Sequence, residues 1–436
     1  MADVKAFCAL RYNPEKTADL SKVITPPYDV INAAMQDDLY HASPYNIIRL
    51  EWGKIFDSDH ENDNRYIRAK EFFEKWQQDD ILKQDPKPAF YLYKQEFQIL
   101  GQNIVRSGFM ATIKAEGYDS GQVLPHEETL PKHKVDRLQL MRHTFANFSP
   151  IFGLFAQESR NIDHALARGS NNKAPDIDIT DGDGVRHLLW VVDDADITAE
   201  IEKDFQNLHV YIADGHHRYE TASAFAKECR EKGLDGCDHM MIALVNLYDP
   251  GLVVLPTHRM VKNLPDFQKA DFLNKLQAAG FTLEEIAASN KEQALKTILQ
   301  QIAANGKEKP SFGLYFPEQF YVISLLDKKS AIAKIRPDKS AAYRQLDVSI
   351  LHSLILEDLL GIGAKELAEE GWIGYTREDQ EALDKVDSGE YLFSFLMNST
   401  AVQELLDVAE AGDKMPQKST FFYPKMIAGL TVNKLK

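Results

Sequence analysis

The sequence has few cysteines and no long run of apolar residues. Its three cysteines, Cys8, Cys229 and Cys237, are odd in number and form no C-x-x-C pair. That pattern is typical of reduced thiols in a cytoplasmic protein and not of a disulfide-bonded secreted one. No apolar run approaches the roughly 20 residues that a membrane-spanning helix needs. The first residues lack a basic stretch followed by an apolar one, so we expect neither a membrane anchor nor a signal peptide.

Several common site motifs are also absent. The sequence contains no G-x-x-x-x-G-K-[ST], no G-x-G-x-x-G, no H-E-x-x-H and no G-x-S-x-G. These absences exclude an ordinary P-loop NTPase, a Rossmann dehydrogenase, a zincin protease and an α/β-hydrolase. No spacing matches a known metal site, so we predict no protein-held metal ion.

The chain has 436 residues, of which 44% are apolar and 27% charged, as in an ordinary soluble globular protein. Its length predicts two to four domains, or one large domain with appendages, and is sufficient to bury a core without disulfides. The formal net charge is −16. Such a charge repels nucleic acid and anionic membranes at long range, so it disfavours both as partners. The sequence says nothing of the oligomeric state.

Hydrophobic periodicity predicts alternating strands and helices. We expect an amphipathic helix at 64–78, paired strands at 90–98 and 104–115, and a helix at 134–148. Prolines exclude a helix at 24–31. A strand at 208–213, a helix at 217–232 and a strand at 240–247 are predicted to form a βαβ-like unit. A long helix is predicted at 341–360.

These elements predict an α+β fold with a mixed sheet. We expect a core domain at residues 1–265 and a small α/β subdomain at 266–335. A mainly helical C-terminal region, 336–436, should end in a tail strand that packs back on the core, because three aromatic residues in the tail are too apolar for a free terminus.

The strongest candidate site is the turn Asp214-Gly-His-His-Arg218. An apolar strand leads to Asp214, and a helix begins just after Gly215. Helix N-termini carry free N–H groups and bind phosphate or carboxylate. Gly215 allows close backbone approach, and His216, His217 and Arg218 add donors. The alternative is a plain strand–helix corner in which Asp214 caps the helix. We favour a phosphate site, with Asp214 and His217 as catalytic candidates.

A second cluster lies at 124–137. Glu127 could act as a base, while Lys134 and Arg137 could bind an anion; a solvated surface of mixed charge is an equal alternative.

Two further segments carry phosphate-binding residue types. Thr257, His258 and Arg259 follow a strand, and their place after the βαβ-like unit predicts that they lie near Asp214. Lys418, Ser419 and Thr420 open the aromatic tail segment. We expect the tail lysines, Lys418 and Lys425, to reach the same cleft, although a simple buried strand would also explain the segment.

Seven stretches of this chain resemble domain-of-unknown-function family 1015. They run in order along nearly the whole chain: Pro26–Val30, Tyr45–Glu51, His126–Leu138, Asn147–Phe152, Ala213–Ala222, Leu255–Arg259 and Lys418–Lys425. The resemblance implies a ParB/sulfiredoxin-like fold. In that superfamily a comparable turn at a helix start binds nucleotide phosphates, in free-serine kinases that use ADP or ATP and in CTP-binding ParB clamps. The cysteine of sulfiredoxin is absent from the turn, which argues against sulfinic acid reduction.

We therefore hypothesise a phosphotransferase that uses ATP or ADP, with Mg²⁺, on a small polar metabolite such as an amino acid. Phosphoryl transfer depends mainly on positioning and charge neutralisation. One alternative is a nucleotide-binding switch that acts on a protein partner without turnover. Another alternative is a metal-dependent hydrolase that uses His126, His216 and His217.

Overall fold

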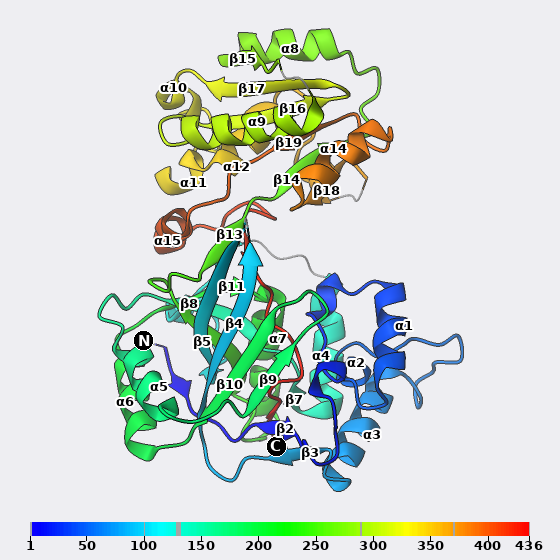
Figure 1. The fold of residues 1–436 in the computed structure, drawn as a ribbon, viewed down its shortest axis with the longest axis vertical. Coiled ribbons are helices and arrows are strands. Elements are labelled where there is room, and N and C mark those ends of the chain that lie inside the picture. Colours follow the sequence, from blue (N-terminus) through cyan, green and yellow to red (C-terminus); the bar gives the residue numbers. More distant parts are fainter. Residues whose placement is uncertain (1, 100, 128–131, 288–289, 369–370, 436) are drawn as a thin grey trace. The chain divides into compact units, whose positions relative to one another are not determined.

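The protein is described by a computed structural model, which covers residues 2–99, 101–127, 132–287, 290–368 and 371–435. The chain forms two compact units. The first unit contains Met1–Pro125, Thr129–Val253 and Pro424–Lys436. The second contains His126–Glu128 and Val254–Tyr423. Figure 1 shows both along the chain.

A nine-stranded mixed sheet forms the centre of the first unit. Its strand order is β6-β11-β8-β12-β5-β4-β10-β9, with β1 paired to β5. Two of the pairs, β6 with β11 and β8 with β12, are parallel. The strands are β1 (Val4–Lys5), β4 (Phe90–Ile99), β5 (Gln102–Lys114), β6 (Val123–Leu124), β8 (Ile151–Phe155), β9 (Ile177–Thr180), β10 (Arg186–Val192), β11 (Val210–Asp214) and β12 (His239–Asn246).

Helices and short strand pairs surround this sheet (Figure 1). The helices are α1 (Ala33–Ala42), α2 (Ile48–Glu51), α3 (Arg65–Gln78), α4 (Lys132–Thr144), α5 (Asn161–Ser170), α6 (Ala195–Phe205) and α7 (His216–Glu231). α5 and α6 pack near β10 and β1, and α7 packs on β8 and β12. β2 (Leu10–Tyr12) pairs with β3 (Leu82–Gln84), and β7 (Ala146–Asn147) pairs with β21 (Asn433–Lys434).

Local sequence signals account for several of these elements. Asn64 caps α3 through its side chain, and Ala69, Phe73 and Trp76 on one face of α3 are buried, as the periodicity predicts. The predicted strand pair is the β4–β5 hairpin. In α7 the residues at helical spacing, Tyr219, Ala222, Ala226 and Cys229, are buried.

The prediction of a βαβ-like unit is wrong in its strand direction. β11 pairs antiparallel with β8, which pairs parallel with β12, so β11 and β12 run in opposite directions with β8 between them. The C-terminal end of β12 therefore points in the opposite direction from the C-terminal end of β11, where Asp214 lies. The reasoning that placed Arg259 near Asp214 fails, because short apolar strands do not encode their direction.

The last residues of the chain are part of the core of the first unit. Backbone bonds join Ala428 to Thr25 and Val432 to Leu10. Met426, Ile427, Ala428, Leu430, Val432 and Leu435 are all buried. These residues follow the aromatic segment 418–425, whose packing on the core stays a prediction.

A six-stranded antiparallel sheet forms the centre of the second unit. Its order is β15-β17-β16-β19-β14-β18. These strands are β14 (His258–Val261), β15 (Phe281–Glu285), β16 (Ser311–Phe316), β17 (Gln319–Leu325), β18 (Ile373–Thr376) and β19 (Phe393–Leu396). Its helices are α8 (Lys269–Ala278), α9 (Lys291–Asn305), α10 (Lys328–Ile332), α11 (Ala341–Gln345), α12 (Asp347–Ile350), α13 (Ala364–Ala368), α14 (Asp379–Asp387) and α15 (Val402–Glu410). β13 (Val253–Leu255) begins the unit, and β20 (Phe421–Tyr423) ends it.

Three predicted elements differ from the structure. The long helix at 341–360 is interrupted at Leu346, which has extended backbone, and continues as α12 and a π-helix at Leu351–Glu357. The helix predicted at 134–148 ends at Thr144, because Phe145 adopts a positive φ of 48°. Residues Tyr28–Val30 form one 3-10 turn after Pro27, within a stretch predicted to contain no helix.

The two units differ from the three-part division predicted from the sequence. β16 and β17 lie in the predicted small subdomain and β19 in the predicted C-terminal region, yet all three belong to one sheet. Among the described residues, no helix combines the length and the apolar character that crossing a membrane requires.

Candidate functional site

The turn after β11 has the geometry of an anion-binding helix start. Gly215 is the N-cap of the 16-residue helix α7 and has a φ of +90°, which only glycine adopts without strain. No side chain of the described residues caps this helix. Asp214, the alternative cap, turns elsewhere. The start of a helix with such a glycine is a place where a phosphate is favourably bound.

Asp214 pairs with two cations. Its carboxylate lies 3.0 Å from Nζ of Lys425 and 3.3 Å from a terminal nitrogen of Arg218. Burial acts to raise the pKa of Asp214, but the nearby charges of Lys425 and Arg218 outweigh it and hold that pKa well below its ordinary value. Asp214 is therefore ionised at neutral pH and is a weak proton acceptor.

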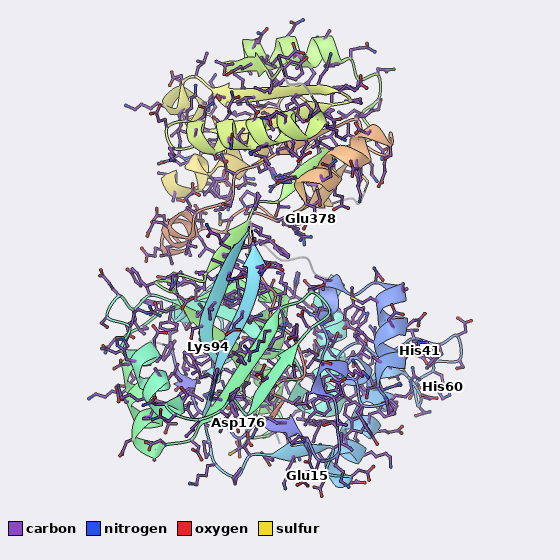
Figure 2. All side chains as sticks on the ribbon, in the orientation of Figure 1. Glu15, His41, His60, Lys94, Asp176 and Glu378 are labelled. Carbon is purple, nitrogen blue, oxygen red and sulfur yellow. The ribbon has the colours of Figure 1, made fainter. Side chains whose placement is uncertain are left out.

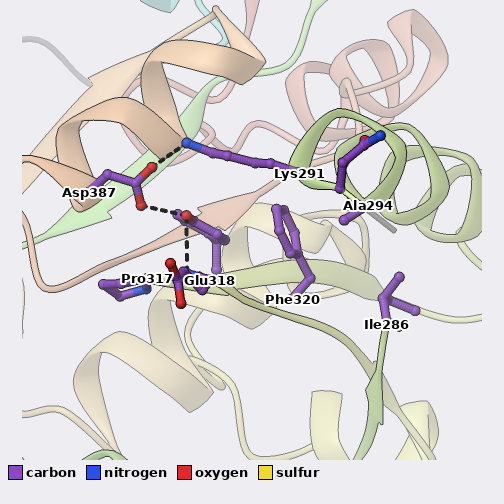
Figure 3. Close-up of a pocket in the computed structure, with 9 residues that line it drawn as sticks. Ile286, Lys291, Ala294, Pro317, Glu318, Phe320 and Asp387 are labelled. Atoms are coloured by element: carbon purple, nitrogen blue, oxygen red, sulfur yellow. Dashed lines mark hydrogen bonds and ion pairs between the residues drawn. The ribbon is translucent and has the colours of Figure 1, made fainter. Parts of the chain in front are cut away.

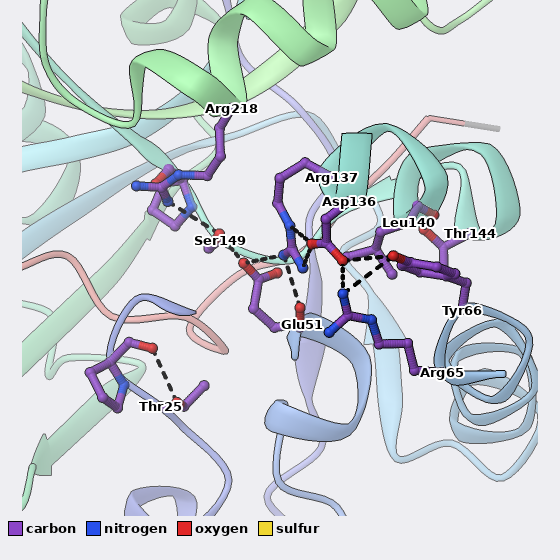
Figure 4. Close-up of polar contacts among 12 residues, drawn as sticks. Thr25, Glu51, Arg65, Tyr66, Asp136, Arg137, Leu140, Thr144, Ser149 and Arg218 are labelled. Atoms are coloured by element: carbon purple, nitrogen blue, oxygen red, sulfur yellow. Dashed lines mark hydrogen bonds and ion pairs between the residues drawn. The ribbon is translucent and has the colours of Figure 1, made fainter. Parts of the chain in front are cut away.

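Arg218 connects this turn to a buried polar network, shown in part in Figure 4. Its guanidinium donates to the carbonyl of Pro150 at 2.6 Å and to the hydroxyl of Ser149 at 3.2 Å. Ser149 donates in turn to Oε1 of Glu51 at 2.8 Å. Arg218 is 9% exposed, so these bonds fix its guanidinium beside the turn.

The network continues from Glu51 to helices α3 and α4 (Figure 4). Arg137 pairs with Glu51 at 3.2 Å and donates to Asp136 at 2.7 Å. Asp136 also accepts from Arg65 and, at 2.7 Å, from the hydroxyl of Tyr66. Arg137, predicted to bind an anion, is therefore buried and already paired. Lys134, its predicted companion on α4, pairs with Glu220 of α7.

The two histidines of the turn differ in exposure. His216 is buried and contributes to lowering the pKa of Asp214, whereas His217 is half-buried on the first turn of α7. The backbone carbonyl of His217 accepts from Thr221.

A separate group of predicted residues lies together in the second unit. The carboxylate of Glu127 accepts the N–H of Lys418 at 3.0 Å, and Arg259 donates to the carbonyl of Lys418 at 3.0 Å. His126 contacts the hydroxyl of Thr420 at 2.8 Å. Residues 128–131, the rest of this loop, lie outside the described residues.

The remaining predicted residues of that unit have structural partners. Ser419 donates to the carbonyl of Pro416, and its own carbonyl accepts from Thr400. His258 is buried between Asp379, at 2.7 Å, and the N–H of Met397, at 3.0 Å. Arg259 donates to the carbonyl of Thr257. The structure thus gathers Glu127, Thr257, Arg259 and Lys418–Thr420 in one unit, and Asp214–Arg218 in the other.

Glu51 and Ser149 are functional candidates that no sequence pattern singled out. Both lie in stretches that carry the resemblance to family 1015, and that was the available signal. Ser149 contacts both Glu51 and Arg218, and so joins residues 51, 149 and 218, which no spacing rule connects.

A larger cavity, of about 760 Å³, lies in the second unit beside α9 and β17. On its wall Lys291 pairs with Asp387 (Figure 3), and Lys291 also lies 3.4 Å from Asp384. None of the predicted site residues lines it. The labelled histidines His41 and His60 are exposed residues of the first unit (Figure 2) and are not among the predicted site residues.

Comparison with solved structures gives only distant matches. A conserved hypothetical protein from Pyrococcus furiosus is 15% identical, with a TM-score of 0.34 over 75% of this chain and 95% of that one. A free serine kinase in complex with AMP is 13% identical, with a TM-score of 0.33 over 72% and 86%. C-terminally truncated SbnI from Staphylococcus aureus is 9% identical, with a TM-score of 0.37 over 75% and 89%.

Comparison with protein families is more decisive. No curated protein matches the sequence. A family model described as "Protein of unknown function (DUF1015)" matches residues 4–349, which is most of the chain. The chain therefore belongs to the DUF1015 family.

Proposed function

We propose that this protein is a phosphotransferase that uses ATP or ADP on a small polar metabolite, and that the turn Asp214–Arg218 holds the nucleotide phosphates. The observation that carries the proposal is the start of α7. There an uncapped helix N-terminus, a glycine at positive φ, and the cations Arg218 and Lys425 occur together. Each of these features favours a bound phosphate, and their combination is rarely needed for folding alone.

The charge balance of the network supports a negatively charged ligand. Its members are the cations Arg65, Arg137, Arg218 and Lys425 and the carboxylates Glu51, Asp136 and Asp214. Four cations and three carboxylates leave one surplus positive charge, to which the helix dipole adds. In a chain with a net charge of −16, this local surplus is suited to an anion.

The proposed roles follow from these contacts. Arg218, Lys425 and the first N–H groups of α7 would neutralise charge on the transferred phosphoryl group. Asp214 would hold the two cations in place, because its low pKa makes it a poor base. His217, on the first turn of α7, is the proposed acceptor of the substrate hydroxyl proton.

The described residues do not themselves form a magnesium site. No group of three or more metal-ligating side chains occurs among them, and Asp214 is already neutralised by two cations. Any Mg²⁺ would be held mainly by the nucleotide phosphates, as is usual for this ion. A metal-dependent hydrolase therefore gains no support from the described side chains.

The finer sequence predictions belong to the same proposal. They are a ParB/sulfiredoxin-like core, a small-molecule substrate in place of nucleic acid, and a cytoplasmic location.

A thermal-shift screen tests nucleotide binding directly. A ligand that binds only the native state raises the melting temperature of the protein. The size of the rise depends on the ligand concentration and on its affinity. We expect ATP or ADP to raise the melting temperature in a saturable manner, and adenosine, which lacks phosphate, to have no effect. Equal shifts with adenosine would argue against a phosphate site.

A product assay then separates the enzyme from the switch. Purified protein is incubated with the bound nucleotide, Mg²⁺ and a pool of small hydroxyl-bearing metabolites, including amino acids. Formation of a phosphorylated metabolite supports a phosphotransferase. Saturable nucleotide binding without product supports a regulatory switch.

A further inference from the structure

The second unit contains a smaller cavity that the proposed function does not use. Its volume is about 150 Å³. The residues that matter for its chemistry are Arg336, His352, Ser353, Glu357, Tyr375 and Gln417. All of them belong to the second unit, so the cavity is formed within one compact body.

A π-helix provides half of these residues. The segment Leu351–Glu357 follows α12 and contributes His352, Ser353 and Glu357 to the wall. π-Helical turns are rare and occur frequently at functional sites, because their wider turn places side chains where a regular helix would not. The part of the predicted long helix that is π-helical thus forms part of the cavity wall.

Buried polar atoms without hydrogen-bond partners lie in and beside this wall. Within the described part of the chain, Nε2 of His352, Nε of Arg259 and the hydroxyl of Thr257 are buried and have no partner. Arg259 contacts the carbonyl of Thr257, and its guanidinium lies 5.8 Å from the ring centroid of Tyr375. Because native proteins satisfy most buried polar groups, a polar ligand in this cavity would find bonding partners here.

Arg259 is a buried cation without a matching carboxylate. It is 2% exposed, and the terminal nitrogens of its guanidinium donate to the backbone carbonyls of Thr257 and Lys418. Among the described residues no carboxylate forms an ion pair with it; Glu127, which affects its charge state, accepts from the backbone of Lys418 instead. A buried charge is costly unless it is compensated, so an anion beside it would be stabilised.

The electrostatics of the wall distinguish two ends. Burial lowers the pKa of Arg259 to about 10, so it stays charged at neutral pH. Burial, and then the charge of Arg259, lower the pKa of His352 to about 3, which leaves its ring neutral. Glu357, by contrast, is exposed and brings a negative charge to the same cavity.

We propose that this cavity binds a small α-amino acid, with its carboxylate attracted by Arg259 and bonded by His352 and Tyr375, and its ammonium group facing Glu357. A cavity of this volume accommodates a molecule of about six non-hydrogen atoms, by comparison with an engineered cavity of similar size that binds benzene. Arg336, on the wall, is already paired with Asp338. This proposal stands apart from nucleotide binding, which concerns the first unit.

Calorimetric titration of the full chain tests the proposal. The ligands are the standard amino acids one by one, together with the hydroxy acid and the amine that match each amino acid that binds, and inorganic phosphate. We expect saturable binding of one or more small amino acids, and binding at least about tenfold weaker for the matched hydroxy acid and amine, since each lacks one charged group. Binding of phosphate alone, or no saturation with any amino acid, would overturn the proposal.

Substitution separates the cavity from general effects of charge. Glu357→Gln removes the charge that would face the ammonium group, and we expect affinity to fall about tenfold with an unchanged melting temperature. His352→Gln should weaken binding of both the amino acid and its hydroxy acid. Glu318→Gln, at an exposed position of the same unit that does not line the cavity, serves as the matched control. Equal affinity for all three variants and the wild type would contradict the assignment.

Discussion

Asp214 should give the protein a specific acid sensitivity. Its pKa is lowered in the folded state, so its ion pairs stabilise the fold above the unfolded pKa, near 3.9, and that stabilisation is lost as the pH falls below it. In Asp214→Asn, which removes the titrating group, we expect a smaller loss of unfolding free energy between pH 4 and pH 2.5. Urea unfolding at several pH values measures the unfolding free energy of both proteins.

The Asn variant should also be less stable at pH 7, because Lys425 and Arg218 lose their shared partner. Asp176→Asn, at an exposed position, is the control. Identical pH profiles for Asp214→Asn and the wild type would show that these ion pairs do not stabilise the fold.

Gly215 combines a conformational and a steric requirement. At its φ of +90°, a Cβ would lie 2.9 Å from both a terminal nitrogen of Arg218 and Cγ2 of Ile151. Gly215→Ala should therefore cost about 1–2 kcal/mol of stability through the backbone and also displace Arg218. The expected result is weaker nucleotide binding together with a lower melting temperature.

Gly121→Ala provides a matched comparison for this effect. Gly121 also has positive φ, at +68°, but a Cβ there would meet nothing within 4 Å among the described atoms. Gly121→Ala should lower the unfolding free energy by a similar amount and leave nucleotide binding unchanged. If both variants bound nucleotide like the wild type, the turn would not cradle a phosphate.

At the level of elements, the C-terminal segment is predicted to be essential for the stability of the first unit. Leu430 is 2% exposed, so Leu430→Ala should lower the unfolding free energy by about 2–5 kcal/mol. Leu392→Ala, at a leucine that is 39% exposed, should cost less than about 1 kcal/mol. Chemical denaturation compares the two, and similar losses would mean that the tail is not part of the core.

Elements with strong local signals were predictable. The capped, amphipathic helix α3 and the β4–β5 hairpin follow directly from periodicity and turn residues. Helix α7 could be placed because an apolar strand, a glycine and a helical stripe follow one another. The interruption at Leu346 could not be foreseen, because the apolar pattern of 341–360 fits one helix as well as three shorter ones.

Long-range contacts set the other limit of sequence reasoning. The direction of β12 relative to β11 depends on β8, which is inserted between them from an earlier part of the chain. The tail sequence predicts that Lys425 reaches the cleft of Asp214. No local pattern reveals its ion pair with Asp214 or the network of Glu51, Ser149 and Arg218. Isolated charged residues in a sequence do not indicate their partners.

At the scale of the whole molecule, the two units have separate hydrophobic cores. One large cluster surrounds Phe109 and Ile242 in the first unit, and another surrounds Phe393 and Ile355 in the second. Chains with several cores often unfold in more than one step. Scanning calorimetry should show a calorimetric enthalpy larger than the van't Hoff enthalpy.

Substitutions in each core should then affect different transitions. Leu430→Ala should lower one melting transition, and Leu383→Ala, fully buried in the second unit, should lower the other. A single transition with equal enthalpies, shifted alike by both substitutions, would contradict independent cores.

The proposed function depends on the binding of nucleotide phosphates by the first unit at the start of α7. Lys425 is suited to test it, because it pairs with Asp214 at the turn, while the side chain of Lys434, in the same unit, bonds to the half-buried Gln77. Loss of a charge-assisted hydrogen bond costs about 1.5–3 kcal/mol, which corresponds to roughly tenfold or more in affinity.

The decisive measurement is calorimetric titration of ATP and of ADP into the wild type, Lys425→Ala and Lys434→Ala. We expect saturable binding to the wild type and to Lys434→Ala. Binding to a folded Lys425→Ala should be at least about tenfold weaker. No binding to the wild type, or equal affinity in all three proteins, would contradict the proposed binding site.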